Sequence, residues 1–225
     1  MEKTNVQNEA QDVKKFFHGY ASDFDSIYGH SNKRSGFDKL MDKLFRQSML
    51  KRFNETLENT KNPSIRSILD VGCGSGVYDV EFLKQGKTVL GLDMAEGMLD
   101  IAKEKTAPYK DSGRISFVLA DYMEHQFTEK YDAAVLMGVF DYVKDPVALL
   151  KKLQRDVTKE IYGSFPTSGG FLTWQRKVRY NMRNCPLYFY NKKSLVDILD
   201  QAGLQGKYTI KDFGRDLYVK VTLSK

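Results

Sequence analysis

Residues 67–78 read Ser-Ile-Leu-Asp-Val-Gly-Cys-Gly-Ser-Gly-Val-Tyr, and residues 88–93 read Thr-Val-Leu-Gly-Leu-Asp. The first stretch opens with a short apolar run, which is too brief for a helix and is typical of a buried parallel strand. Three alternating glycines then allow the backbone to turn sharply and to approach a ligand closely. A helix over about 77–85 and a strand over 87–92 are expected next. The sequence therefore predicts a strand–turn–helix–strand unit that ends at Asp93.

Asp93 follows the second strand, 21 positions after Gly72. Parallel neighbouring strands bring their carboxyl ends together, so an acid there can accept both hydroxyl groups of a ribose. Dinucleotide-binding proteins use this arrangement with the pattern Gly-x-Gly-x-x-Gly. Val77 stands where that pattern needs its third glycine, which disfavours a nicotinamide-dependent dehydrogenase.

The pattern Asp-x-Gly-x-Gly-x-Gly, formed by Asp70, Gly72, Gly74 and Gly76, resembles motif I of the class I S-adenosylmethionine-dependent methyltransferases. The resemblance implies an α/β fold with a doubly wound, mostly parallel seven-stranded sheet, an antiparallel last strand and N-terminal cap helices. It also implies S-adenosyl-L-methionine as the cofactor, with the glycine loop around its methionine end. Cys73 lies inside this loop, where a small residue is needed, and we interpret it as a packing residue.

The resemblance extends the cofactor site to the next two strand ends. Met94 follows the ribose acid, at the position where the family places an apolar residue against adenine. A third strand over 116–120 ends in Asp121 and Tyr122. The resemblance assigns the adenine amino group to Asp121 and the adenine ring to the following backbone N–H. A helix N-cap is the alternative role for Asp121.

The fourth strand, over 131–137, is expected to end beside the sulfonium methyl group, at Met137 and Gly138. The residues just beyond it then meet the substrate, and we predict Asp141 as a general base or orienting group. Tyr28 and Tyr142 are predicted as hydrogen-bond donors in the same pocket. A general base is needed for a phenol, alcohol or ammonium acceptor but not for a carboxylate. We therefore predict in-line methyl transfer to a small-molecule acceptor at oxygen or nitrogen.

The chain is expected to form a single methyltransferase domain in four parts. These are cap helices over 1–62, a cofactor-binding core over 63–165, a substrate lid over 166–193, and a helix with a hairpin over 194–225. Between Phe171 and Lys193 there are six basic residues and no acidic one, interleaved with aromatic residues. This insertion is either a lid or a solvated basic surface.

A narrower likeness is to the magnesium-protoporphyrin O-methyltransferase group. It depends on Phe16-Phe17, Ile27-Tyr28-Gly29, Ser164-Phe165-Pro166 and the basic aromatic insertion. That group has a His-Tyr pair after the fourth strand, whereas this chain has Asp141-Tyr142. The likeness therefore concerns the architecture and not the substrate.

Two other functions remain open. An RNA methyltransferase could use the basic insertion, because aromatic side chains stack on bases. The segment after the fourth strand, however, is not the Asn/Asp-Pro-Pro-Tyr/Phe motif of enzymes that methylate base amino groups. The second alternative is a non-catalytic module that binds the cofactor.

Composition sets the remaining limits. The 225 residues are 41% hydrophobic with a net charge of +6, which favours anionic partners without indicating nucleic acid. No run of eighteen apolar residues is present, so no membrane span is predicted. The two cysteines and three histidines lack metal-ligand spacing, and we expect no metal site and a cytoplasmic location. We expect an anionic or aromatic small molecule as the partner, with RNA less favoured, and the oligomeric state is not indicated.

Overall fold

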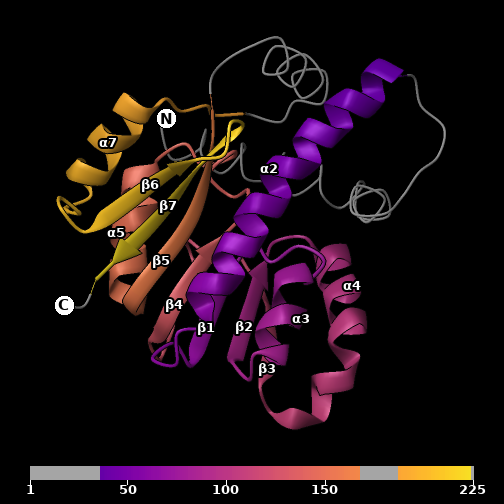
Figure 1. The fold of residues 1–225 in the computed structure, drawn as a ribbon. Helices are drawn as coiled ribbons and strands as arrows, with labels where there is room; N and C mark the ends of the chain where they lie inside the picture. Colours follow the sequence, from indigo (N-terminus) through magenta and orange to yellow (C-terminus); the bar gives the residue numbers. More distant parts are fainter. Residues whose placement is uncertain (1–35, 168–186, 224–225) are drawn as a thin grey trace, which may run out of the picture.

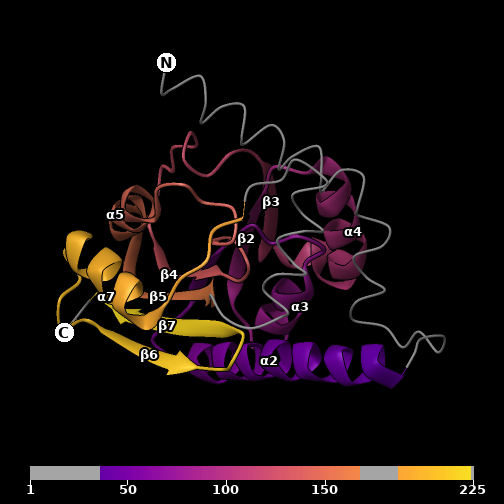
Figure 2. The same cartoon turned by 90° about the horizontal axis from the view of Figure 1, so that it is seen from above.

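The computed structural model describes residues 36–167 and 187–223, with side chains from residue 47 onward. A seven-stranded sheet lies between two layers of helices (Figures 1 and 2). One face carries α2 (Gly36–Thr60), α3 (Val77–Lys84) and α4 (Glu96–Thr106), which leads into the short η1 (Ala107–Ser112). The other face carries α5 (Pro146–Asp156) and α7 (Lys192–Gln201).

The seven strands follow the order β3-β2-β1-β4-β5-β7-β6 across the sheet. All neighbours from β3 to β5 are parallel, whereas β7 is antiparallel to both β5 and β6. This arrangement confirms the predicted doubly wound, mostly parallel sheet with an antiparallel last strand. The strands are β1 (Ser67–Val71), β2 (Thr88–Asp93), β3 (Ile115–Leu119), β4 (Tyr131–Leu136), β5 (Val157–Pro166), β6 (Tyr208–Asp212) and β7 (Asp216–Thr222).

The central strands are largely apolar because both of their faces are buried. Side chains alternate between the two faces of a strand. In β4, Ala133 and Val135 therefore belong to the core beneath α2 and α3, which includes Phe82. Ala134 and Leu136 belong to the core beneath α5 and α7. A continuous apolar run is the expected pattern for a strand covered on both sides.

Capping side chains start the two helices on the second face. Asp145 accepts a hydrogen bond from the backbone of Ala148 (2.9 Å), with Pro146 as the first helical residue. Asn191 and Ser194 form a reciprocal capping box at the start of α7. Helix α7 therefore begins at Lys192 rather than at Ser194, and the last two basic residues of the predicted lid belong to its first turn.

Strand β5 ends in Phe165 and Pro166, which pair with Leu217 and Asp216 of β7. The pairing continues because Phe165 is buried between Phe140 and Tyr190, which contact its ring on either side. Pro166 is accommodated because its carbonyl accepts from the Tyr190 backbone while it has no N–H to pair.

The strand order reverses between β1 and β4, and in such sheets the crevice at the carboxyl ends of these two strands is where ligands bind. Predictions that concern residues 1–35 and 168–186 lie outside the described residues. These include Tyr28, the first cap helix and most of the lid. Within the described segments, no helix combines the length and apolar character needed to cross a membrane.

Candidate active site

The glycine loop follows β1 and is bonded to the end of β2. The backbone N–H groups of Gly72 and Cys73 both donate to the Leu92 carbonyl, at 2.7 and 3.1 Å. Gly72 has φ of +67°, and a Cβ atom there would lie 2.6 Å from the side chain of Val139. Gly74 has φ of +54° and no heavy atom within 4 Å of such a Cβ position. The loop therefore packs closely against the segment after β4 and leaves space open above Gly74.

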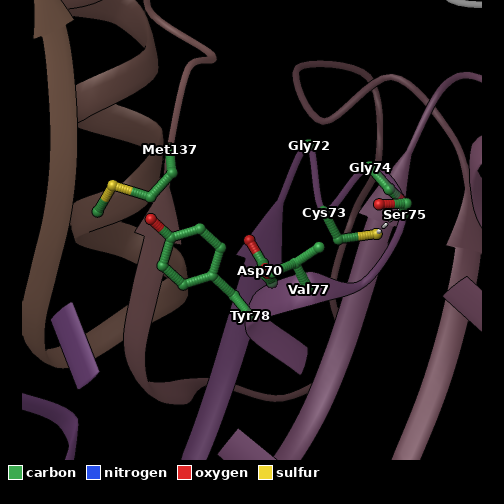
Figure 3. A pocket seen from close by; sticks show the side chains of 8 residues that line it. All are labelled: Asp70, Gly72, Cys73, Gly74, Ser75, Val77, Tyr78 and Met137. Atoms are coloured by element: carbon green, nitrogen blue, oxygen red, sulfur yellow. Dashed lines mark hydrogen bonds between the residues drawn. The ribbon is translucent and has the colours of Figure 1, made fainter. Parts of the chain in front are cut away.

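This space is part of a pocket whose lining includes Asp70 and Met137 (Figure 3). Figure 3 shows the Asp70 carboxyl group between the ring of Tyr78 and the glycine loop. Five predicted cofactor residues meet here: Asp70, Gly72, Cys73, Gly74 and Met137. Three lining residues were not predicted: Ser75, Val77 and Tyr78. These residues lie next to the last glycine of the motif, at the start of α3, and this position in the sequence could have indicated them.

Gly76 contributes to packing and does not line the pocket. A Cβ atom at this position would lie 2.9 Å from the Cβ of Ala102 in α4. Gly76 also occupies the N-cap position of α3 with φ of +74°. The third glycine of the motif therefore lets α3 and α4 approach each other.

Asp93 connects the glycine loop to the start of α4. One carboxyl oxygen accepts from the Gly74 backbone and the other from the Ala95 backbone, both at 2.9 Å. Burial raises the pKa of Asp93, and the hydrogen bonds from these N–H groups offset only part of that rise. Each oxygen can accept a second bond, so the predicted contact with ribose stays a prediction. Met94 follows and is half-buried.

The end of β3 makes structural contacts with its side chains. Asp121 accepts from the backbone of Met123 (2.8 Å) within a turn. No helix begins in the described segment between β3 and β4, so the alternative role of Asp121 as a helix N-cap is wrong. The Tyr122 hydroxyl donates to Asp156 of α5 (2.7 Å), and Lys152 lies 4.2 Å from the ring centroid. The Tyr122 side chain is therefore part of the core on the α5 side, and its backbone remains for the predicted cofactor contact.

Beyond β4, Asp141 is buried beside a segment that the sequence assigned to the lid. Its carbonyl accepts from the Tyr188 backbone (2.8 Å), and the Tyr190 hydroxyl donates to the Phe140 carbonyl (3.0 Å). Burial and the negative charge of Asp141 raise the pKa of Tyr190. Tyr142 is half-buried. Tyr190 is therefore a core residue that holds the segment after β4, and the catalytic roles of Asp141 and Tyr142 stay predictions.

A polar cluster that sequence reasoning missed lies behind Gly138. The Gly138 backbone donates to Ser164 (2.9 Å), whose hydroxyl also accepts from Arg52 of α2 (3.3 Å). Arg52 forms an ion pair with Asp216 of β7 (3.3 Å), which also accepts from Ser48 (3.1 Å). No local spacing could indicate this cluster, because Arg52 and Asp216 are 164 positions apart in the sequence.

Two acids beneath the glycine loop lack partners of this kind. Asp70 on β1 and Asp79 on α3 are 2% and 0% exposed. One oxygen of Asp70 and both oxygens of Asp79 are buried without a hydrogen-bond donor. Burial raises the pKa of Asp70 well above its usual range and that of Asp79 to about 7. A buried, unsatisfied carboxyl group at the base of a pocket suits a ligand that carries positive charge.

The described residues contain no group of three histidine, cysteine or acidic side chains placed to hold a metal ion.

Comparison with known families places a methyltransferase domain over the core of the chain. Residues 68–160 match the family described as "Methyltransferase domain". The ubiquinone biosynthesis O-methyltransferase of Aliivibrio fischeri is 30% identical over 108 residues, which cover 47% of this chain and 45% of that protein. The enzyme of the same name from Hydrogenovibrio crunogenus is 31% identical over 85 residues, covering 38% and 35%. These alignments span less than half of either relative.

Solved structures resemble the whole described fold. Magnesium protoporphyrin IX methyltransferase from Synechocystis PCC 6803, with bound SAH, matches with a TM-score of 0.72 and 18% identity, covering 94% of this chain and 98% of that chain. The methyltransferase domain of bacterial CtHen1 matches with a TM-score of 0.60 and 19% identity, covering 81% and 100%. At these identities the likeness establishes the fold.

Proposed function

We propose that this protein transfers a methyl group from S-adenosyl-L-methionine to a small-molecule acceptor. The match to a methyltransferase domain and the doubly wound fold of class I methyltransferases support this proposal. The proposed acceptor atom is oxygen, with nitrogen as the second choice. Both curated relatives named above are O-methyltransferases, which supports oxygen. The acceptor itself is not specified by these similarities.

The observation that carries the proposal is the charge of the pocket. Its eight described lining residues include the buried carboxyl group of Asp70 and no basic side chain. A dinucleotide would bring a pyrophosphate to this acid, whereas S-adenosylmethionine brings an ammonium group and a sulfonium. The residues therefore fit S-adenosylmethionine better than they fit NAD.

Each predicted cofactor residue then has a distinct task. Asp70 would hold the ammonium group, and Asp93 the ribose hydroxyls. Met94, Asp121 and the Tyr122 backbone would hold adenine. The glycine loop and the backbone of Met137 and Gly138 would enclose the methionine end. Bound in this way, S-adenosylmethionine supplies an electrophilic methyl group on a positively charged sulfur.

The protein's own contribution is to hold the acceptor in line with that methyl group. Such positioning can supply roughly 7–11 kcal/mol of the barrier. Asp141 would accept the proton of an acceptor O–H or N–H, directly or by orienting it, with Tyr142 and Tyr28 as hydrogen-bond donors. A general base contributes about 10²–10⁴-fold in rate. Tyr190 would keep Asp141 in place through its bond to the neighbouring Phe140 carbonyl.

Two measurements test the proposal. Calorimetry should detect binding of S-adenosylmethionine and S-adenosylhomocysteine and no binding of NAD. If neither S-adenosylmethionine nor S-adenosylhomocysteine binds, the proposal is overturned. A screen with a radiolabelled methyl donor against metabolite fractions should label a small molecule, and the labelling should survive ribonuclease. Labelling that ribonuclease abolishes would instead favour the RNA methyltransferase.

The catalytic role of Asp141 has its own test. Asp141→Asn should lower turnover by about 10²–10⁴-fold for an acceptor that must lose a proton. Affinity for S-adenosylhomocysteine should stay within about twofold, because Asp141 does not line the pocket described above. Unchanged turnover would remove Asp141 from the mechanism.

A further inference from the structure

We propose that Asp79 is a positioning residue that shares one proton with Asp70, so that the ammonium group of the cofactor binds Asp70 as that proton is released. This inference rests on the proposed function, because it takes S-adenosylmethionine and its product as the ligands. It assigns a role to an acid that lies outside the glycine motif and that no step above uses.

The geometry of the two acids requires a proton between them. Asp79 is fully buried in the first turn of α3, directly behind the glycine loop, and a Cβ atom on Gly76 would lie 3.4 Å from one of its oxygens. Its carboxyl group is within hydrogen-bonding reach of Asp70. Two ionised carboxylates would leave three buried oxygens without a donor. A single proton turns one acid into a donor to the other and removes most of that cost.

Among the described residues, no lysine or arginine satisfies the buried oxygens of these two acids in the ligand-free protein. Asp93 at the end of β2 adds negative charge, and Cys73 in the loop is a buried thiol whose pKa burial raises further above its usual value. The nearby cation on α4, Lys105, donates to the Ser75 hydroxyl (3.1 Å) and leaves the buried oxygens of both acids unsatisfied. From α2, the aromatic ring of Phe53 packs on Tyr78 rather than presenting a charge.

The charge balance follows directly. In the free protein, the pair holds at least one proton at neutral pH, because burial raises the pKa of both acids. When a cofactor ammonium group reaches Asp70, it stabilises the ionised form, and the O–H bond of the shared acid breaks. The proton passes to solvent, while the ammonium group keeps its own protons and its charge. Binding should therefore become tighter as the pH rises toward and through 7.

The test uses S-adenosylhomocysteine, which keeps the ammonium group but lacks the sulfonium charge. Calorimetry from pH 5.5 to 8.5, in two buffers that differ in ionisation enthalpy, measures both the affinity and the number of protons released. For the unmodified protein we expect release of about one proton above pH 7, with affinity rising up to tenfold per pH unit, and of more than one proton below pH 7, where Asp79 is protonated as well.

Asp79→Asn should release no proton and should bind with an affinity that no longer changes with pH. At pH 6 it should bind more tightly than the unmodified protein, because the introduced amide donates to an Asp70 that is already ionised. Glu81→Gln is the matched control, since Glu81 lies on the same helix in an exposed ion pair with Lys84. This variant should keep the full proton release.

The outcomes separate the two proposals. Binding without proton release in the unmodified protein overturns the inference and leaves the proposed function standing. Equal proton release from the unmodified protein and from folded Asp79→Asn also overturns it, because the proton then comes from another group. If Asp79→Asn does not fold, proton release by the unmodified protein decides the question alone. Absence of any binding overturns the proposed function and the inference with it.

Discussion

Two of the regions in which this protein buries acidic side chains treat the charge in opposite ways. At the junction of α2 and β7, Asp216 is bonded to Arg52 and to Ser48. Beneath the glycine loop, Asp70 and Asp79 have each other, and no cation of the described residues satisfies their buried oxygens. In the first region the acid has a cation and a hydroxyl donor in the absence of a ligand. In the second, the buried oxygens gain a partner only when a proton, or a positively charged ligand, joins the pair.

This difference indicates what each acid is for. A buried carboxylate with a cation and a hydroxyl donor stabilises a junction, and removing its partner is costly. A buried acid left without such partners at the base of a pocket lowers stability and gains its partner on binding. The same residue type thus has a structural role in one region and, by our proposal, a ligand-binding role in the other.

The largest expected effect is on the paired acid. Arg52→Ala should lower the free energy of unfolding by about 3 kcal/mol, because it leaves Asp216 buried without its cation. Urea denaturation measures this change. Lys103→Ala is the control: its ion pair with Asp100 is exposed, and we expect a loss within about 0.5 kcal/mol. Similar losses of stability in both variants would show that the buried pair at this junction contributes no more than an exposed ion pair.

The next effect concerns the loop above the unpaired acids. Gly72→Ala should cost about 2 kcal/mol in stability, since the left-handed backbone disfavours a Cβ atom and Val139 occupies its place. Gly113→Ala has the same backbone requirement, with φ of +66°, but nothing within 4 Å of the added atom. It should cost about 1 kcal/mol. The difference between the two Tm shifts measures the contact with Val139, and equal shifts would argue against it.

A smaller effect is expected at Asp70, where a substitution should weaken ligand binding without lowering the stability of the protein. Asp70→Asn should weaken binding of S-adenosylhomocysteine about tenfold, or about 1.4 kcal/mol. Its free energy of unfolding should stay unchanged or rise, because the introduced amide can donate to Asp79. Asp216→Asn should instead lower the free energy of unfolding, because Arg52 loses its charged partner. Equal destabilisation by the two substitutions would contradict the contrast between the regions.

The smallest effect is a pH dependence of stability in the ligand-free protein. The pKa of Asp79 is about 7 in the folded state, against about 3.9 in an unfolded chain, so the folded state holds a proton that the unfolded state has lost. Stability should therefore fall as the pH rises through 7. One proton corresponds to at most about 1.4 kcal/mol per pH unit, and we expect Asp79 by itself to contribute about 1 kcal/mol of this fall between pH 6 and 7, in the same direction as Asp70.

Acids with lowered pKa values change stability in the opposite direction, in a lower pH range. Asp132, whose pKa is lowered by Lys159 and by backbone N–H groups against the effect of burial, is one of them. Chemical denaturation of Asp79→Asn should show a flatter profile between pH 6 and 7 than the unmodified protein. An unchanged slope would place the titrating group elsewhere.

The sequence predicted what local patterns encode. The glycine loop, the helix that begins at Val77 and the final hairpin all depend on residues close together in the chain. Backbone conformation and capping are short-range properties, so spacing alone carries them. For the same reason, Asp70, Gly72 and Gly74 could be expected to line one pocket before the fold was known.

Features that depend on distant residues were beyond such reasoning. The extension of β5 through Pro166 follows from pairing with β7, which lies about 50 positions later. The core role of Tyr190 follows from its contacts with Phe140 and Phe165. Asp79 carries no motif, and only its complete burial behind Asp70 distinguishes it from an ordinary helical acid.

The polar contacts that hold α2 against β6 and β7 have a consequence for how the chain folds during synthesis. Ser48 and Arg52 meet Asp216, Thr56 meets Tyr218, and Glu55 meets Lys211. On the ribosome, α2 emerges well before any of these partners, which are more than 150 positions downstream. The helix can contact α3 early, through Thr60 and Gln85 among others, but its polar contacts with β6 and β7 must wait until those strands are synthesised. A ribosome stalled before Asp216 should therefore display a core whose first described helix remains accessible to proteases and chaperones.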